Sequence, residues 1–119
     1  VVYHANYLRY FERGRSDALR AAGVSHTDLL DGDRPMAFTV VRMEIDFRRP
    51  ARIDDALEVR TLYERIRGPR MFIRQRLLRD GDLLCEARVE AACIDLSGRP
   101  ARPSPELVRK LAPILDPTA

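Results

Sequence analysis

The sequence predicts an α+β domain, and three observations carry this prediction. Residues 1–23 pass from a short apolar run into an amphipathic helix whose apolar positions recur with the 3.6-residue period. Four later segments alternate apolar and polar residues with the period of two that is typical of half-buried strands. A short helix follows the last of these strands. Because one helix cannot cover both faces and both edges of such a sheet, we expect a homodimer or homotetramer.

Length and composition exclude several other classes of protein. With 119 residues, 45% of them hydrophobic and 33% charged, the chain fits one domain with a single core. Its basic residues, all arginine except Lys110, are interleaved with acidic ones, which argues against nucleic-acid binding. No apolar run approaches the roughly 18 residues that a membrane helix needs. We therefore expect a soluble, cytoplasmic protein without membrane insertion.

The opening helix should pack one face against the sheet. At about 100° per residue, its charged residues fall on one side, and Arg15 alone intrudes among the apolar ones. Gly23 provides the stop signal. The apolar arc consists of Tyr7, Leu8, Phe11, Gly14, Ala18, Leu19, Ala21 and Ala22.

The strands are expected in the middle of the chain, after a polar loop that contains one helical turn starting at Ser25. They cover residues 41–47, 56–66, 71–79 and 83–95. In the first strand the odd-numbered residues, which include Val41, form the buried, dry face. The turns at residues 67–70 and 80–82 join the last three strands into an antiparallel meander.

The end of the chain adds two local predictions. Cys85 and Cys93 lie eight positions apart on one strand, about 26 Å, so they cannot form a disulfide with each other. They are interpreted as small core residues in a reducing compartment, since neither belongs to a metal-ligand spacing.

Ser104 should cap a short helix with Pro105 at its first position, and Pro113 should end or kink that helix.

The stretch VVYHANY, residues 1–7, resembles the hotdog-fold acyl-CoA thioesterases of the 4-hydroxybenzoyl-CoA thioesterase superfamily, and most of all the Tol-Pal-associated ones. The resemblance extends over nearly the whole chain, through residues 10–15, 48–55, 67–68 and 89–95. It implies a long central helix wrapped by a curved antiparallel sheet. It also implies that residues 1–119 are an N-terminally incomplete hotdog domain, whose first strand is missing upstream of Val1.

The resemblance also implies a catalytic arrangement. The free N–H groups and positive dipole end of a helix N-terminus suit the oxyanion of a thioester, and the resemblance assigns this role to the backbone N–H of His4, with its side chain as an assistant. On the residues alone, capping the helix is the commoner role for such a histidine. The resemblance places the aspartate that acts as general base or nucleophile before Val1. Glu12 and Asp17 are interpreted as solvated surface charges.

Five further residues are candidates for the substrate. Asn6 either fixes the start of the helix by side-chain hydrogen bonds or contacts the acyl group of the substrate. Tyr3 is either an aromatic residue of the core or of an interface, or a substrate contact. The resemblance places the coenzyme A phosphates at Arg67 and Arg70, beside a hairpin, and at Arg102, after the last strand. For each arginine the alternative is a solvated loop residue.

These expectations favour an acyl-CoA thioesterase that hydrolyses its substrate to a free acid and coenzyme A, at a subunit interface, with no metal or redox cofactor. Two alternatives stay open. One is a non-catalytic acyl-CoA-binding or envelope-complex scaffold protein of the same fold. The other is a hotdog dehydratase that acts on substrates of acyl carrier protein and uses the His4 side chain as its base.

Overall fold

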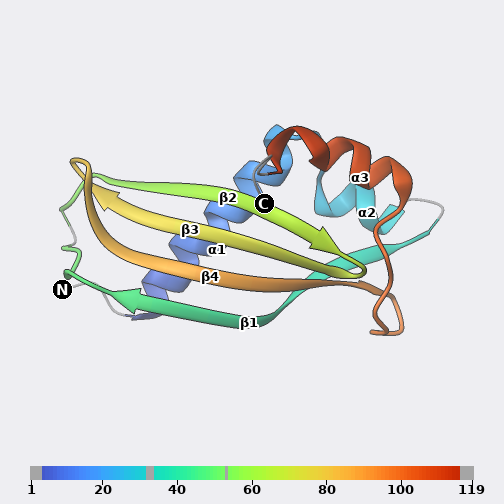
Figure 1. Ribbon diagram of the computed structural model, residues 1–119, viewed down its shortest axis with the longest axis horizontal. Helices are drawn as coiled ribbons and strands as arrows, with labels where there is room; N and C mark the ends of the chain where they lie inside the picture. Colours follow the sequence, from blue (N-terminus) through green and yellow to red (C-terminus); the bar gives the residue numbers. More distant parts are fainter. Residues whose placement is uncertain (1–3, 32–33, 53, 116–119) are drawn as a thin grey trace.

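The computed structural model describes residues 4–31, 34–52 and 54–115. Helix α1 crosses one face of a four-stranded antiparallel sheet, and helices α2 and α3 lie together toward one end of it (Figure 1). The elements are α1 (His4–Ala21), α2 (His26–Asp31), β1 (Met36–Phe47), β2 (Leu57–Arg67), β3 (Arg70–Arg79), β4 (Asp82–Asp95), α3 (Pro105–Leu111) and the 3₁₀ turn η1 (Ala112–Ile114). The predicted α+β class is confirmed.

The strand order is β1-β4-β3-β2, so the predicted meander of the last three strands is confirmed. Strand β1 joins the sheet on the far side of β4, which leaves β1 and β2 as the two edges. Within the meander each strand boundary lies within one residue of its predicted position. The hairpin between β3 and β4 has positive φ at both Asp80 (51°) and Gly81 (84°), as a two-residue type I′ turn requires.

Strand β1 differs most from the prediction. It begins at Met36, five residues before the predicted start, and its register against β4 shifts between Val40 and Arg42. Val40 pairs with Ala91, while Val41 falls in the irregularity and is 45% exposed. The prediction that Val41 belongs to the dry face was therefore wrong, because an irregularity of this kind interrupts the strict alternation on which the prediction depended.

The end of the chain follows its predicted capping signals. The Ser104 hydroxyl accepts a hydrogen bond from the Leu107 N–H at 3.2 Å, and Pro105 is the first residue of α3. The helix ends at Leu111, where η1 takes over with Pro113 inside it. Leu107 and Leu111 are buried, so this short helix closes one end of the core.

Helix α1 buries a narrower face than its sequence predicts. Tyr7, Phe11 and Leu19 are buried, whereas Leu8 is 48% exposed and Ala21 is also exposed. Leu8 and Ala21 were therefore wrongly placed on the buried face. A projection of the sequence at about 100° per residue places every apolar residue on the predicted buried face. A helix that lies across a sheet, however, contacts it along one narrow stripe.

Buried polar groups fix α1 on the sheet. Gln75, on β3, is fully buried, and its amide nitrogen donates to the Phe11 carbonyl at 2.8 Å and to the Thr61 hydroxyl at 3.0 Å. Its amide oxygen accepts a hydrogen bond from Arg15 at 2.9 Å, and the Tyr63 hydroxyl donates to the Arg15 carbonyl at 3.1 Å. Partial burial lowers the pKa of Arg15. Arg15, predicted to lie among the apolar residues of the helix, thus makes a partly buried polar contact between α1 and β3.

Gly14 lets the helix approach the sheet closely. A Cβ atom there would lie 2.7 Å from Val59 Cγ1, 2.9 Å from the Thr61 hydroxyl oxygen and 3.1 Å from the Gln75 amide nitrogen. Two contacts under 3.0 Å put the overpacking cost near the upper end of the usual range of about 1–3 kcal/mol. Because the gain in helix propensity offsets about 1 kcal/mol of it, we expect Gly14→Ala to lower the free energy of unfolding by about 1–2 kcal/mol. Urea denaturation measures this. A variant as stable as the wild type would contradict the close approach.

Candidate functional site

The backbone of His4 begins α1, an 18-residue helix. Its N–H therefore belongs to the first turn, where amide groups have no partner within the helix and the macrodipole is positive. Asn6 is half-buried in the same turn. Tyr3, the other candidate from this stretch, lies outside the described residues. The position of His4 at the helix start agrees with the predicted oxyanion role, which stays a prediction.

Tyr7, one turn after His4, holds the start of α1 against the end of β1. Its side chain is 2% exposed, and its hydroxyl oxygen accepts a hydrogen bond from the Ala51 N–H at 2.9 Å. Its ring meets Phe47 edge-on, with 5.0 Å between the ring centroids and 78° between the planes. The first turn of the helix thus rests on the last residue of β1 and on the segment that follows.

That segment is itself tied to the sheet. The N–H groups of Arg48 and Arg49 both donate to the Leu84 carbonyl on β4, at 2.8 and 3.0 Å. Ala51 is fully buried, although it lies between two elements rather than inside one. Main-chain hydrogen bonds to β4 therefore hold the chain directly after β1, before it continues to β2.

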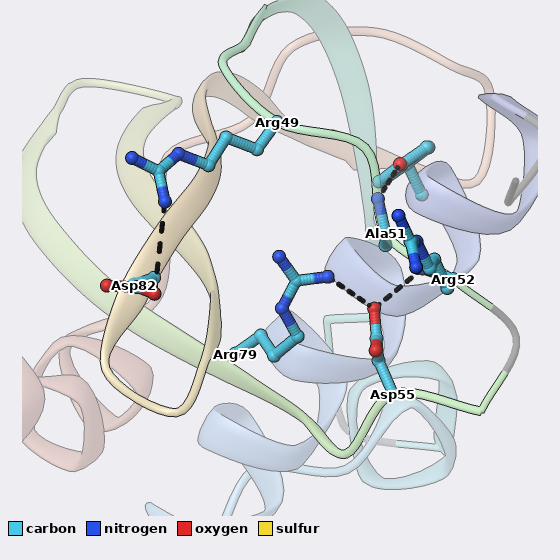
Figure 2. A network of polar contacts seen from close by, with 7 residues as sticks. Arg49, Ala51, Arg52, Asp55, Arg79 and Asp82 are labelled. Atoms are coloured by element: carbon cyan, nitrogen blue, oxygen red, sulfur yellow. Dashed lines mark hydrogen bonds and ion pairs between the residues drawn. The ribbon is translucent and has the colours of Figure 1, made fainter.

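Asp55 fixes the other end of the segment, as Figure 2 shows. Its carboxylate accepts hydrogen bonds from the Arg52 N–H at 2.7 Å and from the Arg79 guanidinium at 2.8 Å. The hydrogen bond from Arg52, and after it the one from Arg79, lower the pKa of Asp55. Beside this pair, Arg49 and Asp82 form an exposed ion pair at 3.9 Å. Residues 48–52 together with Asp55 thus contact β3 and β4 beside the start of α1.

The arginines predicted to bind phosphate lie elsewhere. Arg67 and Arg70 flank the turn between β2 and β3, and Arg102 follows β4 near the same end of the sheet. The N-terminus of α1 contacts the opposite end, where β1 stops at Phe47. Ten residues of β3 separate these ends by about 30 Å. Within one chain the structure therefore does not bring the three arginines together with His4.

The side chains of these arginines differ in how free they are to bind an external anion. Arg70 forms an ion pair with Glu90 at 2.9 Å on the face of the sheet away from α1. Arg67 and Arg102 are exposed. Of the three, Arg67 and Arg102 therefore remain the better candidates for an external anion.

The carboxylates of α1 are remote from His4. Glu12 and Asp17 are exposed and lie eight and thirteen positions further along, about 12 and 20 Å by helical rise. Neither is placed to activate water at the helix start. Across residues 4–31, 34–52 and 54–115, His, Cys, Asp and Glu form no group of three or more that could hold a metal ion. Within those same ranges no helix is long and apolar enough to cross a membrane.

The two cysteines are free and fully buried. Burial raises the pKa of Cys85 to about 11 and of Cys93 to about 12, so both stay as unreactive thiols. We expect the native protein to show no rapid reaction with Ellman's reagent at pH 8. Both thiols should react once guanidinium chloride unfolds the chain. A fast-reacting native thiol would contradict this burial.

Comparisons with known proteins add independent findings. Residues 1–86 match the family model described as the thioesterase superfamily. The chain is 40% identical over 96 residues to the acyl-CoA thioesterase YbgC of Haemophilus influenzae, across 81% of this chain and 70% of that protein. It is 29% identical over 104 residues to the long-chain acyl-CoA thioesterase FadM of Escherichia coli, across 84% of this chain and 75% of that protein.

A solved structure matches as well. The crystal structure of a probable thioesterase from Bartonella henselae superposes with a TM-score of 0.83 at 44% sequence identity. The match covers 87% of this chain and 86% of that one.

Proposed function

Because the chain belongs to the thioesterase superfamily, we propose that it hydrolyses acyl-CoA thioesters to a free carboxylic acid and coenzyme A. The hotdog fold predicted from the sequence is confirmed by the same comparisons. The observation in the structure that supports the activity best is the start of α1 at His4, which provides a backbone N–H donor at the positive end of a long helix.

In the proposed reaction the thioester carbonyl accepts a hydrogen bond from the His4 N–H. Attack by water forms a carbon–oxygen bond at the carbonyl carbon and places negative charge on this oxygen, and the fixed donor stabilises that charge more than it stabilises the neutral ground state. Collapse of the intermediate breaks the carbon–sulfur bond, and a proton from the attacking water ends on the sulfur, so that the products are the free acid and coenzyme A as its thiol. Glu12 and Asp17 lie too far along α1 to activate the attacking water at the helix start.

The activity is tested by steady-state release of coenzyme A from a panel of short-chain, long-chain and aromatic acyl-CoAs. We expect turnover of at least one substrate class, with no background from the two buried protein thiols. The absence of turnover on the whole panel would refute the proposal and favour a non-catalytic acyl-CoA-binding protein. Equilibrium binding of the same acyl-CoAs would then identify that alternative.

We further propose that the active form is a homo-oligomer in which a second copy supplies the phosphate-binding arginines. Two features support this: Arg67 and Arg102 lie at the opposite end of the sheet from His4, and β1 is an edge strand with exposed Val40, Val41 and Phe47. An exposed apolar edge strand is a surface on which a further strand can pair.

Mixing two defective proteins tests this arrangement. The double variant Arg67→Ala, Arg102→Ala should raise KM for acyl-CoA but not for the corresponding acyl-pantetheine, which lacks the nucleotide. Co-refolding it with a His4→Pro protein should restore activity at subsaturating acyl-CoA, because mixed oligomers contain one intact composite site. No restoration in verified mixed oligomers would place both sets of residues in one chain.

We also propose that the protein acts in a reducing compartment such as the cytoplasm. The two free, buried cysteines support this proposal, since paired cysteines are usual in oxidising compartments.

A further inference from the structure

A backbone oxyanion donor is useful only if its helix turn is held in place. The N–H cannot be adjusted by a rotamer change, so its position depends on how the first turn of α1 is anchored to the rest of the molecule. A displacement of about 1 Å can cost 10²-fold in rate. The contact nearest to His4 therefore matters for the reaction as well as for the fold.

The described anchors of α1 are spread along its length. The Gln75 amide reaches the Phe11 carbonyl, and the Tyr63 hydroxyl reaches the Arg15 carbonyl. These carbonyls lie seven and eleven positions after His4, about 10 and 17 Å along the axis. Tyr7 lies only three positions after His4. Among the polar contacts described between α1 and the sheet side of the molecule, the one from Tyr7 is the closest to the helix start.

We propose that Tyr7 is a positioning residue that holds the His4 N–H in place by joining the first turn of α1 to residues 48–52, which follow β1; this rests on the function proposed above. The Tyr7 hydroxyl accepts from the buried Ala51 N–H, and its ring packs edge-on against Phe47. A hydrogen bond and a ring contact in different directions restrict both the position and the rotation of the helix start.

The residues on both sides of Ala51 are themselves held by polar contacts, so they can support Tyr7. On one side of Ala51, the Arg48 and Arg49 amides are bound to β4. On its other side, the Asp55 carboxylate accepts from the Arg52 amide and pairs with Arg79 at the end of β3 (Figure 2). Tyr7 therefore connects the helix start to two strands.

The test compares Tyr7→Phe with Tyr63→Phe in the full chain. Each substitution removes a buried hydroxyl together with a hydrogen bond to the backbone, but only the first affects the turn that carries His4. We expect Tyr7→Phe to lower kcat about tenfold or more with KM changed by less than about twofold, as for an interaction that serves the transition state. Tyr63→Phe should keep kcat within about twofold of the wild type.

Hydrogen–deuterium exchange gives a readout that does not depend on activity. In Tyr7→Phe the amides of the first turn of α1 should exchange faster, while those of its second half should keep the wild-type rate. In Tyr63→Phe the first turn should exchange as in the wild type. A merely structural role for Tyr7 would change exchange throughout the molecule.

The outcomes separate this inference from the proposed function. An active wild type together with an unchanged kcat in Tyr7→Phe overturns the inference alone, as does an equal loss in Tyr63→Phe or an effect confined to KM. A wild type that turns over no acyl-CoA overturns both. If Tyr7→Phe does not fold, Phe47→Leu replaces it, since Phe47 is 46% exposed and its loss loosens the Tyr7 ring. A lower kcat at unchanged KM then supports the inference, and an unchanged kcat overturns it.

Discussion

His4→Pro is expected to lower kcat by 10²–10³, the loss that is typical when one oxyanion donor is removed. Proline has no N–H, but it is tolerated at the first position of a helix, where His4 stands, so the variant should fold. Because the donor acts on the transition state, KM should change little. Steady-state kinetics on the preferred acyl-CoA measures the effect, and circular dichroism verifies that the helix content is kept.

His4→Ala is the matched control, because it deletes the side chain and keeps the backbone N–H. We expect it to lose less than about tenfold in kcat. A loss of 10²–10⁴ in His4→Ala would instead be typical of a missing general base, as in a hotdog dehydratase. Wild-type rates in both variants would show that the oxyanion is stabilised elsewhere.

Phe11→Ala should lower the free energy of unfolding by about 3–5 kcal/mol. The Phe11 side chain is fully buried between α1 and the sheet, and its removal leaves a cavity that the anchored helix cannot close. Urea denaturation followed by circular dichroism measures the change.

Leu8→Ala serves as the control on the same helix. Leu8 has the same apolar character in the sequence but is 48% exposed, so we expect a loss of about 1 kcal/mol or less. Equal losses in the two variants would show that Leu8 is covered in the native protein, most simply by a second copy of the chain.

Local sequence signals predicted the elements that depend on local physics. The alternation of apolar and polar residues predicted β2, β3 and β4 to within one residue, and Asp80-Gly81 predicted the tight hairpin between the last two. Strand β1 was predicted five residues too short, because residues 36–40 do not alternate and the irregularity near Val41 breaks the pattern. The pairing of β1 with β4 was not predicted, since no local signal records which distant strand is the neighbour.

The site was predicted less completely than the fold. The resemblance carried by residues 1–7 assigned His4 to the helix start, and α1 begins at that residue. Tyr7 was predicted only as part of the apolar face of the opening helix, since its hydrogen bond joins residues 44 positions apart. Gln75 carried a usable signal that was missed: it occupies the inward register of β3 between Ile73 and Leu77, where a polar residue needs buried partners.

The strand order also has a consequence for how the chain folds. Hairpins between β2, β3 and β4 close over a few residues, whereas the partner of β1 among the described strands is the distant β4, as in Met36 with Asp95 and Phe47 with Cys85. During synthesis β1 therefore has no partner strand, and its apolar side chains stay exposed, until β4 has left the ribosome. Because such distant pairings form slowly, this interval is when the chain is most exposed to aggregation, and a chaperone that binds extended apolar segments would find its target in β1.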